Sequence, residues 1–197
     1  PNSNFNIYEW GANNATTANR PLFNGTNVTT NTYNGYTAAF GNINIDLSAS
    51  SEDNSLFLIS SGVTANIAHK DITFINPSSA ANRNIAILNS GNATSGIGGN
   101  FIVDDLYSPT RKVVFANAGN LNFTINGNMQ LDGATTVITT SSTAGTNTYV
   151  YVDGNMNVTP SAVLDFSTTS AGGSPPPAGH INLKGDLMVA GSGLFQN

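Results

Sequence analysis

The stretch Gly154-Asn155-Met156-Asn157-Val158 belongs to a frame that recurs along this chain. Each copy opens with glycine, continues with Asn or Asp, and has apolar residues at its third and fifth positions: Gly41–Ile45, Gly99–Val103, Gly127–Leu131 and Gly185–Val189, with Lys70–Phe74 differing only in its first residue. The first positions, 41, 70, 99, 127, 154 and 185, lie 29, 29, 28, 27 and 31 residues apart. A near-constant period in this range indicates a repeat architecture.

A second marker keeps the same phase. The stretches 56–62 (LFLISSG), 85–91 (IAILNSG) and 113–119 (VVFANAG) each run from apolar residues to a final glycine. Each of these glycines lies eight residues before the next opening position. Two markers that share one period indicate a true repeat rather than a chance match.

The apolar residues of each frame alternate with polar ones. A period of two is typical of a β-strand, and the β-branched and aromatic residues support that assignment. Further strands are expected before the later glycines, at 123–125, 150–152 and 181–183, and no segment shows helical spacing. Three short strands per turn predict an all-β fold, a parallel β-helix (solenoid) with about six coils of 27–31 residues.

The frame also predicts the corners of the coils. Glycine at the opening position suits a tight turn with positive φ, although Lys70 does not fit this explanation. Asn or Asp at the next position tolerates a left-handed backbone, and stacked amides can form a hydrogen-bonded ladder along the rod. We therefore expect a structural corner and ladder at Gly41, Asn42, Asp71, Gly99, Asn100, Gly127, Asn128, Gly154, Asn155, Gly185 and Asp186.

The two ends of the chain differ in their fit to the repeat. Residues 1–40 match it poorly and contain the only tryptophan, Trp10. Because terminal repeats are often atypical, we interpret 1–40 as a degenerate first coil or N-terminal cap, with an aromatic patch for a sugar or protein partner as the alternative. Residues 41–197 are interpreted as β-helix repeats, and we expect the rod to continue beyond 197. Within them, residues 168–179 contain a Gly/Ser stretch and three prolines and predict an extruded loop.

The densest group of charged residues falls in loops at one phase of the repeat. Residues 48–55, 76–84 and 105–112 occupy equivalent places, so we expect them to stack along one edge. We favour solvated loop tips with weak surface ion pairs. The alternative is a recognition edge, because loops on a rigid scaffold often carry binding. The residues of this possible binding edge are Glu52, Asp53, Arg83, Asp105, Tyr107, Arg111 and Lys112.

Composition argues against several classes of function. Only 9% of the residues are charged and the net charge is −5, whereas binding to nucleic acid requires a basic patch. No apolar run approaches the roughly 20 residues of a membrane helix, so we expect no membrane span. The chain has no cysteine, which excludes disulfides and thiolate metal sites. We expect no cofactor and no metal.

Acidic residues and histidines are the candidate catalytic groups of this sequence. Parallel β-helices include pectin-degrading lyases and hydrolases, which need converging acids or a pair of carboxylates. Asp104 and Asp105 are the best candidates, but consecutive strand residues point to opposite faces. The weaker candidates are the pair Glu52 and Asp53 and the isolated Asp132, Asp153 and Asp165. His69 and His180 lie in coils that are not neighbours, so we expect each at a turn or on the surface, without a shared metal. We therefore predict no catalytic residue and expect that the chain is not an enzyme.

Two of the frames carry a resemblance to known repeats. The segments 152–158 (VDGNMNV) and 183–189 (LKGDLMV) resemble repeats of large secreted cell-surface proteins of Bacteroidota and, more loosely, those of filamentous haemagglutinin and autotransporter passengers. The likeness extends over about residues 41–197. It implies a bacterial extracellular or cell-surface location, often an adhesive role, and in Bacteroidota export by the type IX route.

Three hypotheses of function follow. The leading one is a non-enzymatic surface protein segment, a β-helical adhesin or stalk that presents a loop edge to a surface ligand, either a protein or a glycan. The second is a carbohydrate-active β-helix similar to polysaccharide lyases or hydrolases. The third is a structural or cargo component of a larger secreted assembly, with the secretion machinery among its partners.

Overall fold

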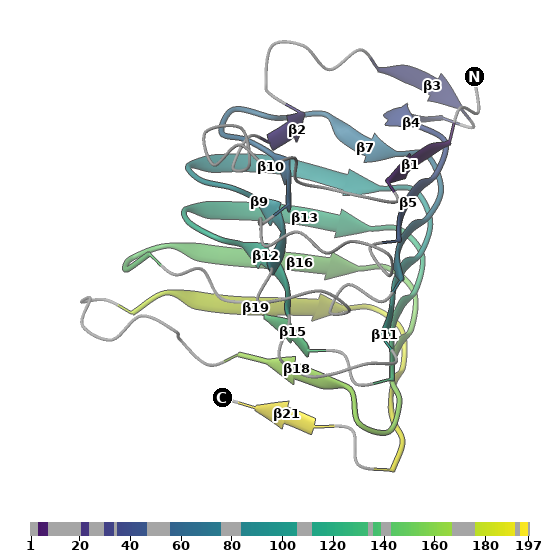
Figure 1. Ribbon diagram of the computed structural model, residues 1–197, viewed down its shortest axis with the longest axis vertical. Coiled ribbons are helices and arrows are strands. Elements are labelled where there is room, and N and C mark those ends of the chain that lie inside the picture. The colour runs from purple at the N-terminus through teal and green to yellow at the C-terminus, as the bar shows by residue number, and fades with distance from the viewer. Residues whose placement is uncertain are drawn as a thin grey trace.

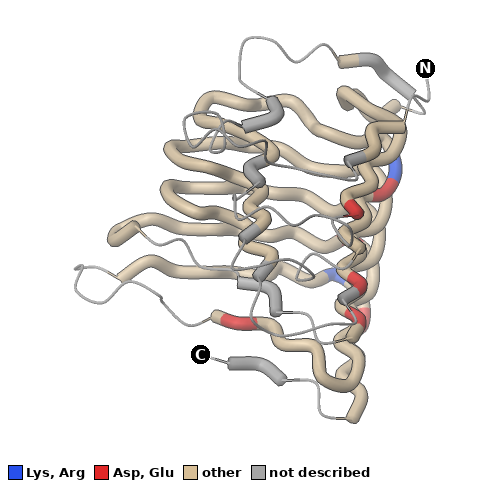
Figure 2. Tube along the Cα trace, viewed as in Figure 1, with Lys and Arg blue, Asp and Glu red and all other residues tan. Residues whose placement is uncertain are grey.

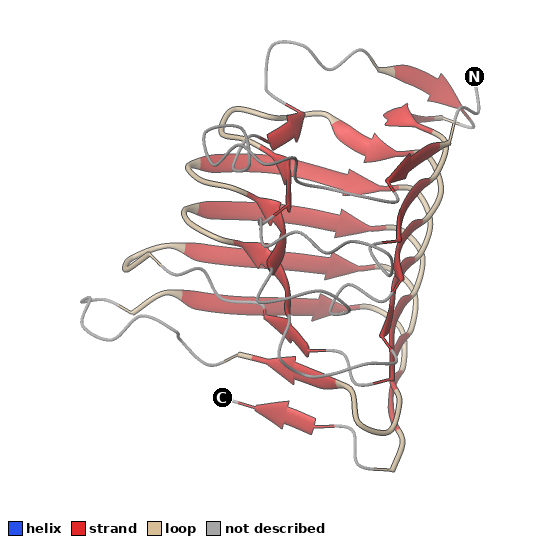
Figure 3. Cartoon of the chain, in the orientation of Figure 1, coloured by secondary structure: helices blue, strands red, loops and turns tan. Residues whose placement is uncertain are grey.

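The computed structural model describes residues 4–7, 21–23, 30–33, 35–46, 56–75, 84–105, 112–133, 136–138, 143–166, 176–191 and 194–196. These residues form three sheets of seven strands each, and none of them is helical (Figures 1 and 3). All strand pairs are parallel except for one hairpin, β3–β4. The predicted all-β parallel β-helix is confirmed, with seven strands per sheet where the sequence predicts about six coils.

The frame strands form sheet A. Its order is β1 (Phe5–Ile7), β5 (Ile43–Asp46), β8 (Ile72–Ile75), β11 (Phe101–Asp105), β14 (Met129–Gly133), β17 (Met156–Val158) and β20 (Leu187–Val189). Phe101 pairs with Ile72 on one side and with Met129 on the other. These residues lie in one column, so the register that the repeat predicts is present.

The other two strands of each coil form sheets B and C. Sheet B has the order β2 (Pro21–Phe23), β6 (Leu56–Ile59), β9 (Asn84–Leu88), β12 (Lys112–Ala116), β15 (Thr136–Ile138), β18 (Val163–Asp165) and β21 (Leu194–Gln196). Sheet C has the order β19 (Ala178–Leu183), β16 (Asn147–Val152), β13 (Asn120–Ile125), β10 (Asn92–Ile97), β7 (Asn66–Ala68), β4 (Tyr36–Phe40) and β3 (Asn31–Tyr33). Each full coil passes from sheet A to B to C, as β5, β6 and β7 do before β8 begins the next one.

Part of the N-terminal region joins the stack. β1 pairs in parallel with β5, and β2 pairs in parallel with β6. β3 and β4 instead form an antiparallel hairpin at the end of sheet C. The region before residue 41 thus contributes strands to all three sheets with an irregular connection. Trp10 lies outside the described residues.

The third and fifth positions of each frame face the interior. From Ile43 to Val158, the side chains at these positions are at most 2% exposed. In the last frame Leu187 and Val189 are 50% and 43% exposed, although the alternation predicts a place in the same core column. They belong to β20, the last strand in sheet A, against which only one coil packs.

Aromatic side chains from the three sheets meet in the core. Phe101 of sheet A lies 5.1 Å from Phe115 of sheet B and 6.4 Å from Phe123 of sheet C, measured between ring centroids. Phe74, one coil earlier, lies 5.4 Å from Phe101. Aromatic pairs at such distances contribute about 0.5–1.5 kcal/mol each beyond the burial of their area. The core therefore ties the three sheets of each coil together and each coil to the next.

The Asn/Asp column joins each coil to the one after it. The side-chain oxygens of Asn42, Asp71, Asn100, Asn128 and Asn155 each accept the backbone N–H of the equivalent residue in the next coil, at distances of 3.2, 2.7, 2.8, 2.8 and 2.9 Å. A hydrogen-bonded ladder along the rod is therefore present, but its bonds run from backbone N–H to side-chain oxygen and not between the stacked amides. Because only an oxygen acceptor is needed, Asn and Asp are interchangeable in this column.

The opening glycines are needed for a different reason from the one expected. Gly99, Gly127, Gly154 and Gly185 do not have positive φ. At Gly154 a Cβ would lie 2.5 Å from Asn128 Oδ1 and 2.7 Å from the carbonyl oxygen of Gly127. The expected positive φ occurs instead in the second marker, at Gly62, Gly91 and Gly119, with values of 81°, 78° and 101°. The opening glycine thus permits close approach of neighbouring coils.

One local expectation is wrong. Ala178 and Gly179, assigned to the extruded loop, begin β19 and pair with Asn147 and Thr148. Pairing with an existing strand outweighs the low strand propensity of Ala and Gly. His69, expected at a turn or on the surface, lies in a bend directly after β7, in agreement with the first alternative. It is only 6% exposed, and its ring packs edge-on against that of Tyr36 with centroids 6.4 Å apart.

Candidate functional site

Sheet C differs from the other sheets in charge. None of its seven strands contains Asp, Glu, Lys or Arg. Sheet A contains Asp46, Asp104, Asp105 and Asp132, and sheet B contains Lys112 and Asp165. Figure 2 shows β10, β13, β16 and β19 of sheet C in tan along their whole length. Sheet C therefore presents a broad face without formal charge.

The outward side chains of sheet C form columns across the coils. One column consists of Thr94, Asn122, Tyr149 and His180, which are partners in successive strand pairs. The next consists of Gly96, Thr124, Tyr151 and Asn182. Inward residues between them, such as Phe123 and Val150, are fully buried. The alternation thus places amides, hydroxyls and aromatic rings together on the outside of the rod.

The aromatic residues of these columns stack on one another. The rings of Tyr149 and His180 are 4.5 Å apart between centroids and 10° from parallel. Tyr151 lies two residues further along the same strand, with its centroid 6.4 Å from that of Tyr149 and its plane tilted by 19°. Tyr151 is 38% exposed. Contacts with neighbouring rings therefore hold these side chains in one orientation at the surface.

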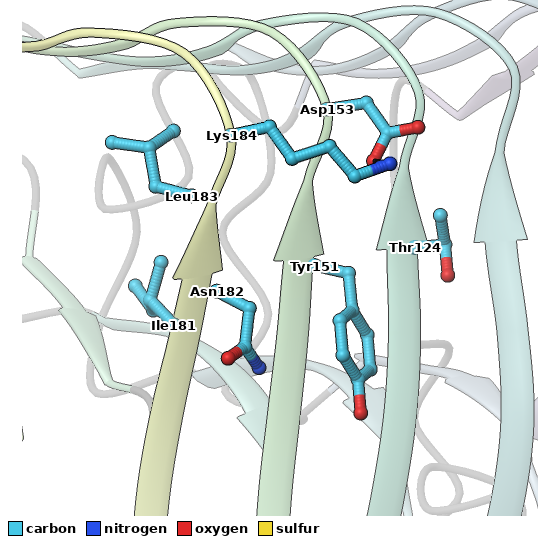
Figure 4. Close-up of a pocket in the computed structure, with 7 residues that line it drawn as sticks. All are labelled: Thr124, Tyr151, Asp153, Ile181, Asn182, Leu183 and Lys184. Carbon is cyan, nitrogen blue, oxygen red and sulfur yellow. Dashed lines mark ion pairs between the residues drawn. The ribbon is translucent and has the colours of Figure 1, made fainter.

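A shallow groove of about 570 Å³ lies beside Tyr151 (Figure 4). Its lining residues come from three strands of sheet C and the turns after them: Thr124, Tyr151, Asp153, Ile181, Asn182, Leu183 and Lys184. Lys184 Nζ lies 2.7 Å from Asp153 Oδ1, so the two charges of the groove pair with each other. The groove combines the Tyr151 ring and two aliphatic side chains with two neutral polar groups and one ion pair.

A second groove lies on the same sheet, nearer to the N-terminal coils. Its volume is about 360 Å³, and its lining consists of Val63, Thr64, Asn92, Ala93, Thr94, Asn120 and Asn122. Asn120 Nδ2 donates to Asn92 Oδ1 at 2.8 Å, and Asn120 Oδ1 accepts the backbone N–H of Asn147 at 2.8 Å. These bonds orient the amides along the rod. A polar, uncharged surface thus continues from one groove towards the other.

The possible binding edge lies almost wholly outside the described residues. Glu52, Asp53, Arg83, Tyr107 and Arg111 are not described, and Asp105 and Lys112 are described only as strand ends. The segments 47–55, 76–83 and 106–111 all connect a strand of sheet A to a strand of sheet B. The strands on either side of these segments lie at equivalent places in sheets A and B, while the stacking of the segments themselves stays a prediction.

The structure brings together two carboxylates that the sequence analysis kept apart. Asp104 and Asp132 are register partners in β11 and β14, and both alternate with buried residues. Neighbouring strands are about 4.8 Å apart, so the two side chains share the outer face of sheet A. Gln130 Nε2 donates to Asp132 Oδ2. A retaining glycosidase uses two carboxylates that lie side by side, and this pair is the arrangement in the described residues that comes nearest to it.

Metal-binding clusters and membrane-spanning helices are both absent from the described part of the chain. There, no group of three or more His, Cys, Asp or Glu residues is arranged to hold a metal ion. No helix long and apolar enough to cross a membrane occurs among these residues. Comparisons with protein-family models, with curated proteins and with solved structures find no match for this chain.

The outer face of sheet C was not predicted, although the sequence indicates it through residues at equal phase in the repeat. Thr124, Tyr151 and Asn182 each lie three residues before an opening glycine, at 127, 154 and 185. Asp104 and Asp132 each lie five residues after one, at 99 and 127. Comparing non-apolar residues at equal phase would have found both groups.

Proposed function

We propose that this protein is a non-enzymatic segment of a bacterial surface protein, a β-helical adhesin or stalk that holds a ligand-binding face away from the cell. The observation that carries the proposal is the charge-free outer face of sheet C, with its exposed Tyr151 and its row of amides. Rigid solenoids bind through such extended surfaces. The backbone and side-chain bonds between coils support the rigidity that a stalk needs.

The proposal is tested by measuring whether the chain binds a ligand without cleaving it. The purified chain is immobilised and offered a panel of polysaccharides and matrix-type proteins, and reducing ends released from the polysaccharides are measured in parallel. We expect saturable retention of at least one ligand and no release of products. Retention of none of them, or steady release of oligosaccharides, contradicts the proposal.

The location is tested separately. The resemblance of the repeats to secreted proteins of Bacteroidota supports an extracellular position and export by the type IX route. Antibodies against the purified chain should label intact cells of the source bacterium, and labelling should disappear when type IX export is blocked. Labelling only after the cells are lysed contradicts the surface location.

A second candidate, a carbohydrate-active enzyme, is favoured by one specific observation, the pairing of Asp104 with Asp132. One carboxylate would act as acid and the other as nucleophile on a glycosidic bond. This candidate predicts oligosaccharide release that Asp104→Asn abolishes, while Asp186→Asn, a change at a distant exposed corner, leaves it intact. Absence of turnover in the wild-type protein rejects it.

A further inference from the structure

We propose that the outer face of sheet C binds a neutral polysaccharide obliquely across its strands, with one pyranose unit in the groove beside Tyr151. This inference rests on the proposed function and adds the ligand class and the site. Three features of the groove carry it: its charge, its aromatic ring, and the polar groups that flank the ring.

The charge of the site selects a neutral ligand. The seven strands of sheet C contain no Asp, Glu, Lys or Arg, and the two charges in the groove are paired at 2.7 Å. An anionic or cationic polymer finds no unpaired opposite charge there, and it would have to compete with the Asp153–Lys184 pair. A neutral polymer rich in hydroxyl groups can form hydrogen bonds with this surface, because amides and hydroxyls both donate and accept hydrogen bonds.

The ring of Tyr151 supplies the apolar contact. A pyranose has hydroxyl groups around its rim and C–H groups on its faces, and the face of an aromatic ring is electron-rich. Tyr151 is 38% exposed, and its ring is held near-parallel to that of Tyr149, which in turn stacks on His180. Because the orientation is set before binding, little side-chain entropy is lost when a sugar docks.

Polar groups flank the ring at strand spacing. Thr124 is the register partner of Tyr151 on β13, and Asn182 is its partner on β19. Two strand spacings of about 4.8 Å separate these two side chains, so they lie roughly 10 Å apart with the ring between them. Figure 4 shows Thr124 and Asn182 on opposite sides of Tyr151. This arrangement offers hydrogen bonds to hydroxyls on both rims of a ring placed over Tyr151.

The second groove indicates a chain rather than a single sugar. It lies across the same sheet and is lined by Asn92, Thr94, Asn120 and Asn122, all of them exposed. The bond from Asn120 to Asn92 fixes the amides along the direction in which the coils stack. The two grooves are offset along the strands, because Asn122 and Asn120 lie two and four residues before Thr124, the partner of Tyr151. A linear polysaccharide that runs obliquely across the strands would contact both grooves.

Affinity measurements on the intact chain test the inference. Isothermal titration calorimetry is carried out with neutral glucans, mannans and galactans and with polygalacturonate as the charged polymer. We expect at least one neutral polysaccharide to bind, with an affinity that added salt does not change. Tyr151→Ala should weaken that affinity about tenfold, the loss of one aromatic contact, and Asn182→Ala should weaken it several-fold.

Met188→Ala is the matched control. Met188 is 54% exposed in β20 of sheet A, away from sheet C, so this variant should bind as the wild type does. Circular dichroism melting curves of all variants check that the fold is intact. Unchanged affinity in Tyr151→Ala, or preferential and salt-sensitive binding of polygalacturonate, overturns the inference.

The same assays separate the inference from the proposed function. If the chain is retained on a protein ligand but binds none of the polysaccharides, the glycan site is rejected and the adhesin proposal stands. If nothing is retained, or if a polysaccharide is cleaved, both are rejected.

Discussion

The close contact between coils at Gly154 yields a stringent prediction. In Gly154→Ala the new Cβ would lie 2.5 Å from Asn128 Oδ1, 2.7 Å from the Gly127 oxygen and 2.8 Å from the Gly127 carbonyl carbon. Two of these atoms are backbone, so the clash cannot be relieved by rotation of a side chain. The bonds from Gly154 N to the Gly127 oxygen, 3.0 Å, and from Asn155 N to Asn128 Oδ1, 2.8 Å, run through the same contact.

The magnitude follows from these contacts. Overpacking costs about 1–3 kcal/mol, and the weakening of two hydrogen bonds adds about 0.5–1.5 kcal/mol each, so we expect Gly154→Ala to destabilise by about 2–6 kcal/mol. For a chain of this size that lowers Tm by roughly 5–20 °C. Chemical denaturation followed by circular dichroism measures the loss.

Gly145→Ala is the control. Gly145 has a φ of 71°, and no atom lies within 4 Å of the position that a new Cβ would take, so only backbone strain opposes the change. That strain costs about 1–2 kcal/mol. If Gly154→Ala is no more destabilising than Gly145→Ala, the opening glycine is not required by coil contact and the explanation of the repeat's first position is wrong.

The remaining predictions concern the core, the pH dependence and the groove. Phe101→Ala should destabilise by about 3–5 kcal/mol, because its ring is fully buried against three others; a loss below about 1 kcal/mol would contradict that packing. Burial raises the pKa of Tyr36, so the folded state retains a proton that the unfolded state releases above about pH 10, and stability should fall as the pH rises beyond that value. Tyr36→Phe should flatten this alkaline fall in denaturation midpoints, and an unchanged fall would reject the assignment. Lys184→Met should change stability by less than about 1 kcal/mol, because Lys184 is 72% exposed in its pair with Asp153; a larger loss would show that the pair is structural.

The fold was predictable because the repeat encodes its own register. Residues such as Ile72, Phe101 and Met129 hold the same place in successive frames, and in a solenoid equal phase means contact. The alternation around them then determines which side faces the core. Local propensity was less informative: Ala178 and Gly179 are poor strand formers, and only pairing with β16 makes them a strand.

The role of the opening glycine could not be predicted from one coil. A glycine in a turn suggests positive φ, which is a property of its own backbone. At Gly154 the constraint comes instead from Gly127 and Asn128 of the preceding coil. Such a contact depends on how closely the coils stack, and that distance is absent from the sequence of either turn.

The candidate site could be predicted from the sequence only in part, for a related reason. The charged residues of the sequence indicate a binding site in the loops, whereas the grooves lie on a sheet whose strands contain no charged residue. Thr124, Tyr151 and Asn182 are 27 and 31 residues apart in sequence, and they become neighbours only through stacking. The equal phase of Asp104 and Asp132 could have been read in the same way.

Cross-linking across coils tests the central claim, that residues of equal phase lie side by side. The chain has no cysteine, so pairs can be introduced cleanly. Gln130 and Asn157 are register partners in adjacent strands of sheet A, and Met188 follows Asn157 one coil further on. A spacing of about 4.8 Å permits a disulfide and twice that spacing does not. Under mild oxidation the Gln130→Cys/Asn157→Cys variant should form an intramolecular disulfide and the Gln130→Cys/Met188→Cys variant should not. The reverse result, or no bond in either variant, would contradict the stacked coils.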